Sequence, residues 1–157
     1  MISVSVQQED FDTGEEYRQL QAENGRTGAI VLFTGLARDI ADDPLAILQL
    51  EHYPGMTEAS LRQTAEQADQ RWPLMDIRII HRVGELSPGD QIVLVAVSST
   101  HRAAAFSACE FIMDILKTSA PFWKKEIHRD GRGHWVEAKA SDQQRAQRWR
   151  EASQEDT

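Results

Sequence analysis

The most regular pattern of apolar and polar positions lies in residues 98–126. Apolar side chains recur there at the spacing of a helix with one buried stripe, at Ala105, Phe106, Cys109, Ile112, Met113 and Leu116. One of the residues Ser98, Ser99 and Thr100 can cap the start of this helix, and Pro121 prevents its continuation. The stretch therefore predicts an amphipathic helix between a hydroxyl-rich turn and a proline.

Shorter apolar runs on both sides of this helix predict β-strands. Residues 28–34 and 91–98 are almost continuously apolar, as expected of strands that are buried on both faces. Other runs rich in strand-forming residues predict further strands at 2–7, 46–53, 75–83, 122–128 and 134–139. A tight turn before residue 91 and a glycine-containing loop before residue 134 indicate two antiparallel pairs.

Helix signals precede two of the remaining polar segments. Asp12 or Thr13 can cap a short helix over residues 15–22, whose first turn carries two glutamates. Thr57 can cap a longer helix that runs to Arg71, where a Trp-Pro pair stops it. Two further helices are therefore expected before the one in the central stretch.

The order of these elements predicts the fold class. Asp142 begins a last helix, and strands and helices alternate irregularly along the chain. Such a mixture is typical of an α+β fold, here with a mixed or mainly antiparallel sheet. We expect one domain over residues 1–150 and a polar tail over residues 151–157.

Composition narrows the possible partners. The chain has 157 residues, 41% of them hydrophobic and 27% charged, which is ordinary for a soluble globular protein. Its net charge of −8 argues against nucleic-acid binding, which needs a basic face. No apolar run approaches the ~20 residues of a membrane span, and the N-terminus does not follow a signal-peptide pattern. We therefore expect a cytoplasmic protein that binds neither nucleic acid nor membrane.

The single cysteine, Cys109, falls on the apolar stripe of the central helix. It has no cysteine partner within the chain, and free cysteines are among the most buried residues of globular proteins. We therefore expect a core thiol rather than a reactive nucleophile. If the protein handles sulfur, its own thiol is not the carrier.

Cationic residues gather at both ends of the central helix. Residues 98–126 carry four lysine or arginine residues and three acidic ones, against a net charge of −8 for the whole chain. At the start, His101 and Arg102 lie beside free backbone N–H groups, where an anion binds well. A neutral histidine packed at a helix start is an equally good interpretation of this pair.

Lysines follow at the other end of that helix. Lys117 lies at the edge of the apolar stripe, with Lys124 and Lys125 shortly beyond the proline. A lysine that is partly desolvated beside another cation has a lowered pKa, which suits it for nucleophilic or acid–base work. Arg38 follows a buried strand, a common place for a binding residue, although an ion pair with Asp39 is the simpler interpretation.

Motifs for bound cofactors are weak. The chain has no phosphate-binding loop and no dinucleotide fingerprint after a strand. His128 and His134 flank the predicted hairpin loop near Glu126, but without cysteines or a recognised ligand spacing they do not favour a metal site. We expect no metal and no other cofactor.

Several longer motifs appear in order over residues 2–150. They are Phe33-Thr34-Gly35 before Arg38, Leu50-Glu51-His52-Tyr53-Pro54-Gly55-Met56-Thr57, His81-Arg82-Val83-Gly84-Glu85-Leu86, and residues 98–102 and 111–126. Together they carry a resemblance to the large, catalytic subunit of molybdopterin synthase. The resemblance implies an α/β-hammerhead type of fold with an additional antiparallel β subdomain, which is compatible with the α+β prediction.

The resemblance also implies an activity and partners. The enzyme would convert cyclic pyranopterin monophosphate to molybdopterin by installing two sulfurs as a dithiolene. The sulfur would arrive as a thiocarboxylate on the C-terminal Gly-Gly of a small ubiquitin-like carrier subunit. The large subunit would form a homodimer that binds two carriers, which makes a heterotetramer.

Site residues carry over from the resemblance. The substrate pocket would comprise Leu36, Ala37, Arg38, His101, Arg102, Lys117, Lys124, Lys125 and Glu126, some of them across the dimer interface. Lys117 would face the thiocarboxylate, and Lys124 would assist proton transfer or charge stabilisation. The chain departs from the expected pattern at Leu36 and Ala37, which replace a more polar pair. It also has Lys139 in place of an arginine, and lysine cannot make the bidentate phosphate contact of arginine.

Two alternatives make different predictions. A non-catalytic module of the same fold, which binds an anion or docks the carrier, would handle its ligand unchanged after the substitution Lys117→Ala. A metal hydrolase that uses His128 and His134 would retain a bound metal through purification.

Overall fold

The computed structural model describes residues 1–21, 25–39, 45–136 and 139–155. Its elements are β1 (Ile2–Gln7), α1 (Thr13–Leu20), β2 (Ala29–Leu36), β3 (Leu45–His52), α2 (Met56–Arg71), β4 (Ile77–Arg82), β5 (Gly84–Leu86), β6 (Gln91–Ser99), α3 (Arg102–Ser119), β7 (Phe122–His128), β8 (Gly133–Val136) and α4 (Ala140–Glu155). The strands form two four-stranded sheets, in the orders β1-β4-β6-β2 and β5-β3-β7-β8. The β1–β4 pair is parallel, and the other strand pairs in the described part of the chain are antiparallel. The α+β prediction with a mixed sheet is confirmed.

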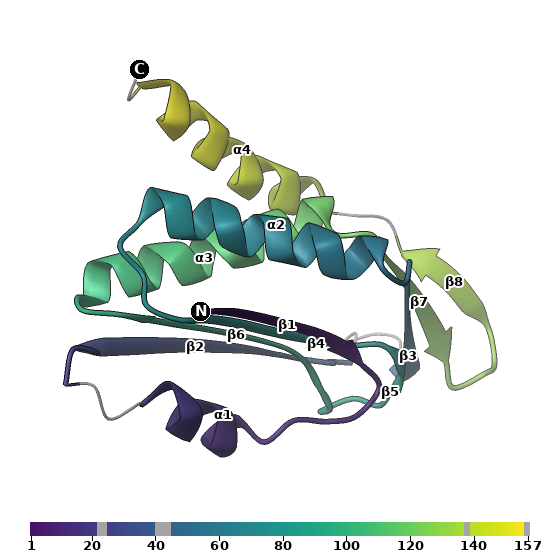
Figure 1. Ribbon diagram of the computed structural model, residues 1–157. Coiled ribbons are helices and arrows are strands. Elements are labelled where there is room, and N and C mark those ends of the chain that lie inside the picture. The colour runs from purple at the N-terminus through teal and green to yellow at the C-terminus, as the bar shows by residue number, and fades with distance from the viewer. Residues whose placement is uncertain (22–24, 40–44, 137–138, 156–157) are drawn as a thin grey trace.

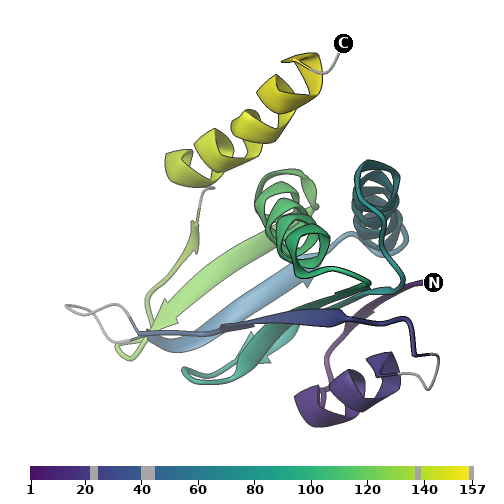
Figure 2. The same ribbon diagram turned by 90° about the vertical axis from the view of Figure 1, so that its left-hand side faces the viewer.

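The first sheet forms the centre of the molecule. Helices α2 and α3 cover one of its faces, and the short helix α1 lies against the other (Figures 1 and 2). Because side chains alternate along a strand, Ile79 and Val95 face the two long helices, whereas Ile80 and Leu94 join the smaller core beneath α1. This double burial explains why the strands of this sheet have nearly continuous apolar sequences.

The second sheet is antiparallel throughout and lies to the side of the first (Figure 1). It is the additional antiparallel subdomain that the resemblance implied. Its hairpin of β7 and β8 was predicted, and β8 ends at Val136, before residues 137 and 138, which lie outside the described part. Strand β5 was missed because a pairing segment of three residues, Gly84–Leu86, is too short to show a pattern.

Helix α3 packs on the first sheet through the predicted stripe, with one exception. Ala105, Cys109 and Ile112 are buried, but Phe106 is 61% exposed, so its predicted burial is wrong. Phe106 lies one residue, or about 100° of helix rotation, past Ala105 and therefore turns away from the sheet. Burial raises the pKa of the Cys109 thiol to about 12, which confirms the predicted core thiol.

The predicted hydroxyl cap of α3 is also wrong. The N-cap residue is His101, and its side chain makes no capping hydrogen bond. Ser98 and Ser99 belong to β6, and Ser99 Oγ donates to the carbonyl of Pro73 at 2.7 Å. The strand continues further than its apolar run, so the serines are used to satisfy buried backbone groups at the end of the sheet.

The other two helix starts were predicted with mixed success. Asp12 caps α1 by accepting a hydrogen bond from the backbone N–H of Glu15. Helix α2 begins two residues earlier than predicted, because its N-cap is Gly55 and not Thr57. The φ of 84° at Gly55 is a left-handed conformation that favours glycine. Thr57 therefore lies inside the helix, where its hydroxyl donates to the carbonyl of Pro121 at 3.0 Å.

A buried carboxylate on α3 holds α4 in place. Asp114 accepts hydrogen bonds from Arg145 Nε at 3.0 Å, from Arg148 at 3.0 Å and from Trp149 Nε1 at 2.7 Å. The exposed Glu110 also pairs with both arginines. Helix α4 continues to Glu155, so the first residues of the predicted 151–157 tail are helical.

Removing the Asp114 carboxylate should loosen α4. We expect Asp114→Ala to lower the free energy of unfolding by about 2–3 kcal/mol, because three donors lose a buried charged acceptor. Glu110→Ala is the matched control and should cost less than about 1 kcal/mol, since its ion pairs are exposed to solvent. Urea unfolding measures both values. Equal losses for the two variants would contradict the role of Asp114.

Candidate active site

A pocket of about 270 Å³ opens at the junction of the two sheets, next to the C-terminal end of α3. Its apolar wall comes from β3, β6, α3, β7 and β8, through Leu48, Leu50, Ile92, Leu116, Ala120, Phe122 and Val136. Its polar side chains are His81, Lys117, Lys124, Lys139 and Asp142. The pocket therefore joins the two predicted lysines with three residues from other segments of the chain.

Lys124 is the half-buried cation of this pocket. Burial is the main cause that lowers its pKa below the ordinary 10.5, and the nearby positive charges of Lys117, Lys139 and Arg38 lower it further. The carboxylate of Glu126 acts in the opposite direction. These electrostatic effects place Arg38 and Lys139 close to the lysine pair, as a site for anionic groups requires.

Three predicted site residues, Lys124, Lys125 and Glu126, lie on strand β7 and point to two different faces of its sheet. Glu126 lies two residues after Lys124, on the same face of the strand, and is buried. Lys125 points to the other face, where its ammonium lies 5.5 Å from the ring centroid of Trp135 on β8. Lys124 therefore lines the pocket, whereas Lys125 lies on the opposite side of the second sheet.

His81 is a pocket residue that the sequence analysis named only within the resemblance. Its ring stacks on Phe122 with centroids 3.8 Å apart, and its Nδ1–H donates to the carbonyl of Arg82 at 2.8 Å. Burial lowers its pKa to about 4, so the ring is neutral at pH 7 and Nε2 is its hydrogen-bond acceptor. The signal in the sequence is a polar residue near the end of an isoleucine-rich strand.

The segment Leu36–Arg38 leads from β2 toward the lysines. The backbone of Ala37 is tied to the turn before β6, through its N–H to Asp90 and its carbonyl to the N–H of Gly89. Ala37 is buried for this reason, while Leu36 is 54% exposed and Arg38 is exposed. The structure thus brings Arg38 to the lysine cluster and leaves Leu36 on the surface.

His101 and Arg102 lie at the opposite end of α3 and are both exposed. Because an α-helix rises roughly 1.5 Å per residue, Arg102 and Lys117 are about 22 Å apart. The first turn of the helix carries no acidic residue, so its backbone N–H groups remain suited to an anion. Within one chain, however, this pair does not reach the pocket.

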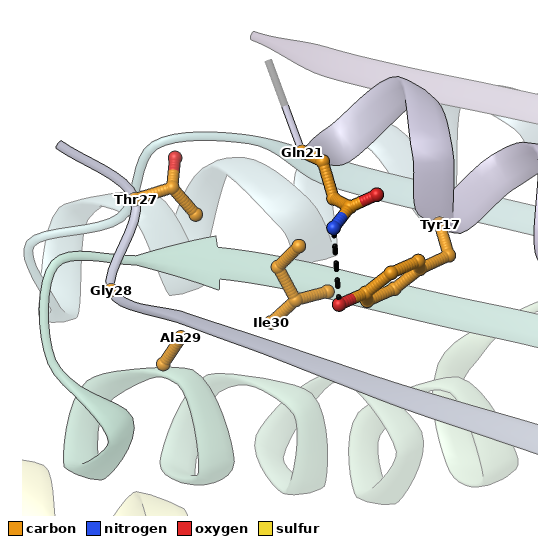
Figure 3. A pocket seen from close by; sticks show the side chains of 6 residues that line it. All are labelled: Tyr17, Gln21, Thr27, Gly28, Ala29 and Ile30. Atoms are coloured by element: carbon orange, nitrogen blue, oxygen red, sulfur yellow. Dashed lines mark hydrogen bonds between the residues drawn. The ribbon is translucent and has the colours of Figure 1, made fainter. Parts of the chain in front are cut away.

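A second pocket, of about 230 Å³, lies between α1 and the start of β2 (Figure 3). It is lined by Tyr17, Gln21, Thr27, Gly28, Ala29 and Ile30. Gln21 Nε2 donates to the hydroxyl of Tyr17 at 3.4 Å, and none of the lining side chains is charged. None of the predicted site residues lines this pocket, so the chemistry is expected at the first one.

Among the described residues, one group of side chains offers metal-ligand atoms. It comprises Glu126, His128 and His134, which lie on the β7–β8 hairpin. Within the same described part of the chain, no helix is long and apolar enough to cross a membrane.

Comparison with known proteins decides the family. The family model of the MoaE protein matches residues 6–119. The chain belongs to the MoaE family. A relative from Vibrio cholerae, named molybdopterin synthase catalytic subunit, is 55% identical over 93% of this chain and 97% of its own length. Further relatives with the same name come from Pseudomonas aeruginosa, at 52% identity over 96% of this chain, and from other bacteria.

Solved structures agree with this assignment. A MoaE protein from Burkholderia ambifaria superposes with a TM-score of 0.81, at 48% identity over 95% of this chain and 98% of its own. A complex of subunits 1 and 2 of molybdopterin-converting factor from Helicobacter pylori shares the fold, with a TM-score of 0.69 at 20% identity over 87% of this chain and 90% of its own. This MoaE-family chain is therefore a catalytic subunit of molybdopterin synthase, a sulfurtransferase of molybdenum cofactor biosynthesis, as predicted.

The buried His81 should make the stability of this MoaE-family chain depend on pH. Its pKa is about 4 in the folded chain and 6.5 in its ordinary environment, so the unfolded chain takes up the proton first as the pH falls. The contribution of His81 is therefore complete above pH 6.5 and disappears by about pH 4, a change of about 3 kcal/mol.

Urea unfolding at pH 7 and at pH 4 measures this change. The variant His81→Gln should lose less stability than the wild type over the same pH interval. His101→Gln, which replaces an exposed histidine, is the control and should keep the wild-type dependence. If His81→Gln behaved like the wild type, His81 would not be a neutral buried group.

Proposed function

We propose that this chain transfers sulfur from the C-terminal thiocarboxylate of a small ubiquitin-like carrier subunit to cyclic pyranopterin monophosphate. The main support for this proposal is that Lys117, Lys124 and Lys139 all line one pocket, although the protein as a whole is acidic. Both reactants are anions, one through its phosphate and the other through its thiocarboxylate. A cluster of positive charges attracts both and offsets the repulsion between them.

The pocket suits the end of a polypeptide chain. Its volume of about 270 Å³ is slightly below the roughly 300–1,000 Å³ of typical small-molecule sites. An extended Gly-Gly terminus is the narrowest peptide end that exists, because glycine has no side chain. We infer that the carrier tail enters between Leu50 and Phe122 and presents its sulfur to the lysines, while the pterin stays at the open side.

The lysines would share the chemistry. Lys117, at the end of α3, would face the thiocarboxylate and neutralise it. Lys124 would move a proton or stabilise negative charge, helped by its partial burial next to other cations. The acceptor Nε2 of His81 is available to an N–H group of the carrier tail. The sulfur comes from the carrier, in keeping with the buried thiol of Cys109.

A second copy of the chain would complete the phosphate site. Arg38 lies near the lysines, but His101 and Arg102 are too far away in the same chain. Strand β2 lies at the edge of the first sheet, where it exposes Phe33 beside Phe106 in a groove of about 500 Å³. We propose that a second copy covers this apolar surface and brings its own His101 and Arg102 to the pocket. Each protomer would then bind one carrier. The related Helicobacter pylori protein is found in a complex of subunits 1 and 2 of molybdopterin-converting factor, which supports a partner subunit here.

Substitution of the pocket lysines tests the sulfur transfer. We expect Lys117→Ala and Lys124→Ala each to reduce molybdopterin formation by about 100-fold or more, because each removes a charge aimed at the reacting groups. The assay uses purified substrate and thiocarboxylated carrier. Arg62→Ala, which removes an exposed positive charge from α2, is the matched control and should keep the wild-type rate.

Circular dichroism and gel filtration should show the same fold and assembly for the three variants. Wild-type turnover in both lysine variants would exclude the proposed roles and would favour a non-catalytic module that only binds the anion or docks the carrier.

A further inference from the structure

We propose that the β7–β8 hairpin binds one divalent transition-metal ion, of the Zn²⁺ class, through Glu126, His128 and His134. These residues lie outside any ligand motif that spacing along the chain would suggest. The register of the two strands brings them together. Glu126 and His128 are two residues apart on one face of β7, and His134 on β8 lies directly opposite Glu126.

The distances between the ligand atoms of these three residues are compatible with one bound ion. One ligand atom of each residue lies within 4.8 Å of those of the other two, and His134 Nε2 is 3.4 Å from Glu126 Oε2. Two ligands of a tetrahedral zinc ion are about 3.3 Å apart, as follows from bonds of 2.0–2.1 Å. The separation within the Glu126–His134 pair therefore already suits zinc, and modest rotation of the rings brings in His128. Because the side chain of His134 is 57% exposed, it is free to make that movement.

The surroundings favour a bound cation over a simple ion pair. Glu126 and His128 are buried, with 8% and 6% of their surface exposed, so two of the three ligands are already ordered. The imidazole rings lie nearly parallel, with centroids 5.1 Å apart, next to the carboxylate. Two imidazoles and one carboxylate are a donor set that zinc accepts, and the exposed side leaves a fourth position for water.

Such an ion would stabilise the β7–β8 hairpin, which borders the active-site pocket. Its ligands come from both strands of the hairpin, so it would tie the end of β7 to the start of β8. Glu126 is two residues from Lys124, on the same strand face. The metal site is thus adjacent to the pocket and distinct from the group of lysines. This inference does not rest on the sulfur-transfer proposal.

Zinc titration of the full, untagged chain tests the proposal. After treatment with a chelator and its removal, isothermal titration with Zn²⁺ should give one ion per chain. The variant His134→Ala should weaken binding by about 100-fold or more, since removing a direct ligand costs at least as much as removing a residue that only orients one. His134 is exposed, so this substitution leaves the core intact.

Two further measurements keep the test decisive. His52→Ala, which removes a histidine from β3 outside the cluster, should bind Zn²⁺ like the wild type. Co²⁺ in place of Zn²⁺ should give visible absorption bands of a site with four or five ligands in the wild type and not in His134→Ala. Absence of Zn²⁺ binding by the wild type, or equal binding by His134→Ala, would overturn the proposal whatever the sulfur-transfer activity.

Discussion

The length of the buried helix α3 is the constraint on which the arrangement of the site depends. The helix packs against the first sheet through residues such as Ala105 and Ile112, which are completely buried. Burying each large apolar side chain stabilises the fold by about 1.5–3 kcal/mol, so the helix cannot shift without loss of the core. Its two cationic ends therefore stay on opposite sides of the molecule. A small substrate held by both ends requires two copies of the chain.

The junction of the two sheets forms the pocket in which the cations meet. It gathers several positive charges around a largely apolar pocket, although the chain as a whole has a net charge of −8. Like charges at close range repel one another until an anion binds. The cluster therefore lowers the stability of the free protein, but it is already arranged to bind an anionic ligand. Among the described residues, Asp142 is the acidic residue that lines the pocket, and Glu126 acts on Lys124 from the same strand.

Strand β7 shows how one element serves several purposes through its alternation. Its inward positions run from Lys124 at the pocket to Glu126 and then to His128 near the hairpin loop, while Lys125 faces Trp135 on the other side. Lys124, the proposed acid–base residue, and the proposed metal ligands Glu126 and His128 are therefore parts of one row of side chains. The strand pairs with β3 on one side and β8 on the other, which holds the row in place.

Much of the fold could be predicted from the sequence because its periodic patterns are local. The apolar run of β6 and the stripe of α3 depend on residues that are neighbours along the chain, and both were found. The exposure of Phe106 and the loss of the predicted serine cap depend on where the sheet lies against the helix. Local patterns do not carry that information.

The site residues also differ in whether local sequence or the tertiary fold brings them to the pocket. Lys117 and Lys124 could be chosen from their place near a helix end and from the resemblance, whereas His81 enters the pocket only because the two sheets meet. The metal-ligand cluster depends on strand register, in particular on the pairing of Glu126 with His134. The sequence analysis placed both histidines beside the predicted hairpin loop near Glu126, but the strand register that sets their separation is not visible in the spacing along the chain.

A mixed dimer tests the central claim most directly. One protomer carries Arg102→Ala and the other Lys117→Ala, with different affinity tags so that the mixed species can be purified after coexpression. If the cations of each site come from two copies, the mixed dimer has one intact site out of two and keeps about half of the wild-type rate of molybdopterin formation, while each parent homodimer is inactive. An inactive mixed dimer, or a chain that stays monomeric, would contradict this account.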